Sequence, residues 1–106
     1  MEVIIVDSSD DTITRSVLAR YTNGKIRTIT SGVRVMPAIQ RNIGAKSAHG
    51  DVLCFIDADA YPADDWVERV LDAYSKGTRV GGGSYLVPPF QRDNKLAVAQ
   101  YYLEFN

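Results

Sequence analysis

Two aspartates that end an apolar run are the residues best placed to do chemistry. Asp57 and Asp59 directly follow residues 52–56, which read Val-Leu-Cys-Phe-Ile. A run without polar alternation is typical of a parallel strand covered on both faces. In open α/β sheets, ligands collect beyond the carboxyl ends of such strands. The spacing therefore predicts a strand, an acidic turn at a ligand site, and a helix that begins near Pro62.

A second apolar run has the same ending. Residues 3–6 are rich in β-branched side chains and are followed by Asp7. Parallel strands bring their carboxyl ends to one edge of a sheet, so we expect Asp7 to join Asp57 and Asp59 there. Crowded carboxylates suit a hard divalent cation, Mg²⁺ or Mn²⁺, which can bridge them to a diphosphate. The alternative is that Asp57 and Asp59 only solvate a strand end and cap the next helix.

The elements that must position these residues alternate along the chain. Turn residues, helical spacing and helix stop signals divide it into alternating segments. The expected strands are 3–6, 25–30, 52–56 and 79–87, and the expected helices begin near 12, at 37, near 62 and at 94, the last running to 105. This order predicts a single α/β domain over residues 1–106, with a mostly parallel sheet flanked by helices and with apolar helix faces turned inward.

Composition excludes several classes of protein. The 106 residues carry a net charge of −1, without the basic field expected of a nucleic-acid-binding protein. The one cysteine, Cys54, lies inside an apolar run and is expected to be a small buried hydrophobe. No apolar run reaches the roughly 20 residues of a membrane span, and Met1 leads directly into a strand. A cytoplasmic setting is expected, and peripheral membrane association would reside in other segments.

Three segments together resemble the nucleotide-binding half of the family 2 glycosyltransferases, which have the GT-A fold. They are residues 3–12, from Val-Ile-Ile-Val-Asp onward; Arg41-Asn42-Ile43-Gly44; and residues 50–59, which contain Asp57-Ala58-Asp59. Their order and spacing match as well as their residues. The resemblance extends more loosely through Val80-Gly81-Gly82 and implies a Rossmann-like sheet of the GT-A type.

The resemblance also implies roles for individual residues. Asp7 would face the base of a nucleotide-sugar donor, and Arg41 would lie near the nucleotide. Asp57 and Asp59 would be the DxD pair, with Asp59 the direct ligand of Mg²⁺ or Mn²⁺ and Asp57 closer to the ribose. The implied reaction is inverting transfer of the sugar to an acceptor, with the base, sugar and acceptor left open.

Two parts of the family pattern have no counterpart in this sequence. Family members begin with one more strand, central to the sheet, and end with an acceptor half that carries the catalytic carboxylate. The catalytic residue is therefore unknown. An absent central strand would leave buried backbone groups unpaired, so we expect the chain to form a homo-oligomer that covers the exposed sheet edge, or to rearrange its strands.

Other functions fit parts of the sequence. A phospho-acceptor receiver domain would use Asp57 as acceptor, with Asp7 and Asp10 holding Mg²⁺, but Lys95 is followed by leucine where such domains usually have proline. A phosphohydrolase would require Thr or Val at the position of Tyr61. A non-catalytic glycosyltransferase fragment is the third alternative. Metal-dependent binding of a nucleoside diphosphate would favour the transferase, and phosphorylation by a small donor would favour the receiver.

Overall fold

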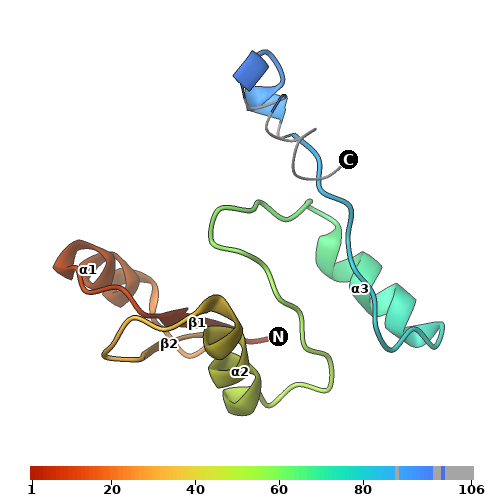
Figure 1. The fold of residues 1–106 in the computed structure, drawn as a ribbon. Coiled ribbons are helices and arrows are strands. Elements are labelled where there is room, and N and C mark those ends of the chain that lie inside the picture. The colour runs from red at the N-terminus through yellow and green to blue at the C-terminus, as the bar shows by residue number, and fades with distance from the viewer. Residues whose placement is uncertain (88, 97–98, 100–106) are drawn as a thin grey trace. The chain divides into compact units, whose positions relative to one another are not determined.

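The computed structural model describes residues 1–87, 89–96 and 99. The chain divides into two compact units, Met1–Phe55 and Ile56–Asn106. Each unit is described by itself below, with the elements labelled in Figure 1.

The first unit is built on two parallel strands. β1 (Val3–Asp7) and β2 (Ile26–Thr30) pair in parallel, with Val3 opposite Ile26 and Asp7 opposite Thr30. Both strands are rich in β-branched residues, which favour extended backbone. Ser31 N–H donates to the Asp7 carbonyl at 2.9 Å and extends the ladder one step beyond the strands. The pairing thus carries the chain in register up to the carboxyl edge, where Asp7 stands.

Helices α1 (Thr12–Tyr21) and α2 (Pro37–Ser47) contact opposite faces of this sheet. Thr28 lies on the face that Ile5 and Asp7 share, and its hydroxyl is 3.0 Å from that of Thr22 just after α1. On the other face, a Cβ added at Gly44 in α2 would lie 3.4 Å from Val6 Cγ2. The strand alternation therefore assigns one helix to each face.

The helix boundaries follow from local chemistry. Asp11 is the N-cap of α1, and its carboxylate accepts from Thr14 N–H at 2.6 Å and from Thr14 Oγ1 at 2.9 Å. These two hydrogen bonds lower the pKa of Asp11. Pro37 opens α2, where its missing N–H costs no hydrogen bond. Both helices begin near the positions that the sequence predicts.

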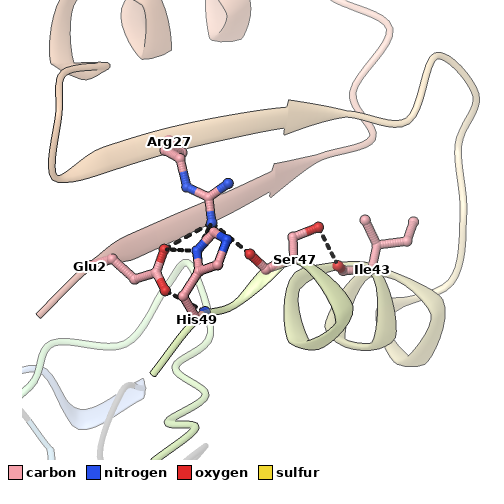
Figure 2. Close-up of polar contacts among 5 residues, drawn as sticks. All are labelled: Glu2, Arg27, Ile43, Ser47 and His49. Atoms are coloured by element: carbon pink, nitrogen blue, oxygen red, sulfur yellow. Dashed lines mark hydrogen bonds and ion pairs between the residues drawn. The ribbon is translucent and has the colours of Figure 1, made fainter. Parts of the chain in front are cut away.

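A polar cluster of Glu2, Arg27, Ser47 and His49 lies at the amino-terminal ends of the two strands (Figure 2). The Arg27 guanidinium lies 2.8 Å from Glu2 Oε2 and donates to the Ser47 carbonyl at 2.6 Å. His49 N–H donates to Glu2 Oε1 at 2.6 Å. The cluster ties the start of β1 to β2 and to the end of α2. The cluster could not be predicted from the sequence, because Glu2, Arg27 and the segment of Ser47 and His49 are far apart along the chain.

The second unit contains α3 (Trp66–Ser75) and the short 3₁₀ helix η1 (Pro89–Gln91). The predicted helix forms, but it begins at Trp66 rather than near Pro62, which lies outside it. Gly77, just past the helix end, takes φ = 96°, a value that glycine adopts without strain. Two ion pairs at i,i+4 spacing, Arg69–Asp65 and Lys76–Asp72, lie on its exposed surface at 2.7 Å each.

The predicted strand over residues 52–56 is wrong for this structure. The segment has no regular secondary structure, and β1 and β2 form a sheet of two strands alone among the described residues. A strand needs hydrogen-bonding neighbours, and no described segment pairs with this one. The prediction that Cys54 is buried is wrong for the same reason, because no layer covers this run and the thiol is exposed.

Two other expectations fail for related reasons. Residues 79–87 form no strand, because the three consecutive glycines favour irregular backbone and no neighbouring strand compensates. The helix faces predicted to turn inward do not form a closed core: within the described part of the chain Asp7 is the one buried residue. Most of the helix predicted at 94–105 lies outside the described residues. None of the described helices has the length and apolar character needed to cross a bilayer.

Candidate functional site

Asp7 combines burial with an unsatisfied oxygen. The residue ends β1 and is 7% exposed. Its Oδ1 accepts a hydrogen bond from Ser9 N–H at 2.9 Å. This bond closes a turn that holds the carboxylate at the carboxyl end of the strand. Its Oδ2 is buried and has no hydrogen-bond partner among the described residues. Because a buried carboxylate oxygen without a partner is costly, this oxygen is a candidate to receive a donor from a ligand.

A cavity of about 480 Å³ adjoins this carboxylate. Asp7, Thr28 and Thr30 line it from the strands, and residues of α1 and its C-terminal end line it opposite. Its volume lies within the range of small-molecule sites. The sheet surface under α1 is polar here because β2 contributes two threonines where an ordinary core would have apolar side chains. Arg15 and Thr30 were not singled out from the sequence, although the alternation of threonines in β2 was visible there.

Arg41 lies in α2, in the same unit as Asp7, and is exposed. Its neighbour Gln40 donates a hydrogen bond from Nε2 to the Ser8 hydroxyl. This contact holds the first turns of α2 beside the polar loop that follows Asp7. The structure therefore brings the segment that contains Arg41 beside the loop that follows Asp7.

Asp57 and Asp59 belong to the second unit, in a turn rather than at the end of a strand. Ala60 N–H donates to the Asp57 carbonyl at 3.0 Å and closes the turn. Both aspartates are exposed. Among the described residues, no three carboxylate, imidazole or thiolate side chains gather in a group that could hold a metal. Asp7 belongs to the first unit, so the gathering of these three carboxylates at one site stays a prediction.

The carboxylates of Asp57 and Asp59 still fit a hard divalent ion. Mg²⁺ in nucleotide sites is usually held by one or two carboxylates, with substrate phosphates and water completing its shell. Two exposed aspartates, separated by one residue in a hydrogen-bonded turn, supply the carboxylate oxygens that such an ion needs from a protein.

Comparison with known proteins assigns the family. The sequence model described as Glycosyl transferase family 2 matches residues 1–103. The chain belongs to glycosyl transferase family 2. This membership supports glycosyl transfer as its function class and decides against the receiver and phosphohydrolase alternatives. The described residues, which form a two-stranded parallel sheet and three α-helices, are consistent with part of a GT-A domain.

One curated relative is a Drosophila melanogaster protein, polypeptide N-acetylgalactosaminyltransferase 3. It is 29% identical over 86 residues, an alignment that covers 74% of this chain and 12% of the relative. The chain thus spans a small part of the length of the relative it matches. No solved structure matches at a significant level.

Proposed function

We propose that this chain binds a nucleotide-diphosphate sugar through Mg²⁺ or Mn²⁺ and serves as the donor-binding domain of a glycosyltransferase. The observation that carries the proposal is the buried Asp7 carboxylate at the carboxyl end of β1, whose Oδ2 has no partner among the described residues, in a chain of this family. The proposed fold of the complete domain is Rossmann-like, of the GT-A type. Transfer of the sugar to an acceptor with inversion is part of the same proposal.

Each proposed role follows from the chemistry of its side chain. The free oxygen of Asp7 accepts an N–H group of the nucleobase, which satisfies a buried acceptor. Arg41 supplies a guanidinium whose fixed donors suit phosphate or ribose oxygens of the nucleotide. Both residues lie in the first unit, and the contact between Gln40 and Ser8 keeps their segments at one edge.

Asp57 and Asp59 hold the metal in this proposal. A bound Mg²⁺ or Mn²⁺ would neutralise the charge that grows on the diphosphate as the sugar leaves. Asp59 is the direct ligand, and Asp57 lies closer to the ribose. The base that deprotonates the acceptor is left unassigned.

Calorimetric titration of the 106-residue chain with UDP and with GDP, each with and without Mn²⁺, tests the proposal. We expect one of the nucleotides to bind with micromolar to millimolar affinity and to bind more weakly without metal. Failure of both nucleotides to bind in the presence of Mn²⁺ would contradict the proposal.

A further inference from the structure

We infer that Thr30 is a specificity-determining residue of the donor site, where its hydroxyl donates a hydrogen bond to a carbonyl of the nucleobase whose N–H is bound by Asp7. The inference rests on the proposed function and extends it to a residue that the family resemblance does not assign. Its basis is the register of the two strands at their carboxyl edge.

Strand pairing places Thr30 beside Asp7. The two residues are register partners at the ends of β2 and β1, and partners in a parallel ladder project to the same face. The hydrogen bond from Ser31 N–H to the Asp7 carbonyl, at 2.9 Å, fixes the backbone immediately after this pair. The hydroxyl and the carboxylate therefore lie on one face, and both line the cavity of about 480 Å³.

The two side chains differ in what they offer a ligand. Asp7 Oδ2 is a buried acceptor without a partner among the described residues. Thr30 is exposed, and within the described part of the chain its hydroxyl makes no hydrogen bond. A carboxylate can only accept, whereas a hydroxyl can donate as well as accept. Together they present an acceptor and a donor side by side.

This pair complements bases that carry an N–H group next to a carbonyl. Uracil presents N3–H between two carbonyls, and guanine presents N1–H beside O6. Cytosine and adenine present an unprotonated ring nitrogen at the corresponding position, which would face the carboxylate with lone pair against lone pair. The site should therefore select uracil or guanine nucleotides over those of cytosine or adenine, and Thr30 should contribute to that selection.

Thr28 provides a matched position inside the same cavity. It lies two residues earlier on the same face of β2, opposite Ile5, and lines the cavity with Thr30. Its hydroxyl is already paired with that of Thr22 at 3.0 Å. Thr28→Val and Thr30→Val make the same substitution at neighbouring sites, but only the second removes a hydroxyl that has no partner among the described residues.

The test is titration of wild type, Thr30→Val and Thr28→Val with whichever of UDP or GDP the wild type binds in Mn²⁺. Loss of one neutral hydrogen bond should weaken binding by Thr30→Val roughly three- to tenfold, a larger loss than that of Thr28→Val, whose hydroxyl is already engaged by Thr22. Equal affinities for wild type and Thr30→Val would overturn the inference and leave the proposed function standing. Absence of wild-type binding would overturn both.

Thio-substituted nucleotides give a second measurement, the difference in affinity between the thio-substituted and the parent nucleotide. A purely structural role of Thr30 would leave this difference unchanged in Thr30→Val. Sulfur accepts hydrogen bonds more weakly than a carbonyl oxygen does, so 2-thio-UDP, 4-thio-UDP or 6-thio-GDP should bind wild type more weakly than the parent nucleotide. Thr30→Val should lose this discrimination at the carbonyl that faces the hydroxyl. Discrimination that persists in Thr30→Val at every position would contradict the assignment.

Discussion

At the scale of the residue, position in the ladder changes what an aspartate can do. Asp7, Asp57 and Asp59 all follow apolar runs in the sequence, yet of these three only Asp7 is buried, because its run is paired in a sheet. The apolar pattern predicted that Asp7 follows a strand and lies at the carboxyl edge of a parallel sheet. It could not predict the free Oδ2 or the neighbouring Thr30, because both depend on the pairing register.

Glu2 carries a prediction about pH. The hydrogen bond from His49 N–H, followed by the one from Arg27, lowers the pKa of Glu2 to about 2. A carboxyl whose pKa is lower in the folded state stabilises that state above its unfolded pKa of about 4.3, and this contribution is lost as the pH falls toward 2. We therefore expect Glu2→Gln to lower the thermal midpoint of unfolding at pH 7, and the deficit to shrink between pH 5 and about pH 2.

Circular dichroism melts of wild type and Glu2→Gln over this pH range give the measurement. Glu68→Gln makes the same substitution in the first turn of α3 and controls for removal of one negative charge. A Glu2→Gln deficit that stays constant from pH 7 to pH 2 would contradict the role assigned to the cluster at Glu2.

At the scale of the element, the sequence predicted those segments whose partners are local. The cap at Asp11, the proline at the start of α2 and the glycine after α3 act within a turn of the chain. Helices α1 and α2 begin near the predicted positions, whereas α3 begins at Trp66 rather than near Pro62. Residues 52–56 have equally strong strand character, but a strand forms only where a neighbour exists. Apolar periodicity reports a preference for burial and contains no information on whether a partner is present.

The contact between α2 and β1 can be tested at Gly44. Alanine there would place its Cβ 3.4 Å from Val6 Cγ2, an ordinary contact, and would remove the entropic cost of a helical glycine. We expect Gly44→Ala to be neutral or to stabilise the chain by up to about 1 kcal/mol. Gly44→Leu should destabilise by roughly 1–3 kcal/mol, because its larger side chain must push α2 from the strand. Urea denaturation measures both, and a Leu variant as stable as the Ala variant would refute this packing.

At the scale of the whole molecule, much apolar surface is uncovered. Leu53, Phe55 and Ile56 are each about half exposed, and no hydrophobic side chain among the described residues is buried. Within the described sheet β1 pairs with β2 alone, so its second edge offers unpaired backbone groups. These features support the proposal that the chain self-associates over this edge.

Sedimentation velocity of the purified chain tests that proposal. We expect a species heavier than the 11.7 kDa monomer at micromolar concentration. A monomer with the unfolding stability of an ordinary small domain would contradict it, since an exposed strand edge would then have no energetic consequence.

The central claim is that this chain holds a nucleotide through a divalent metal. Its most direct test is Mn²⁺-dependent titration of the bound nucleotide into Asp59→Ala, beside Asp64→Ala as a control with the same substitution a few residues along the exposed chain. We predict that Asp59→Ala loses the metal-dependent part of the affinity, while Asp64→Ala retains it and both keep the wild-type circular dichroism spectrum. Unchanged metal-dependent affinity in Asp59→Ala would contradict the account.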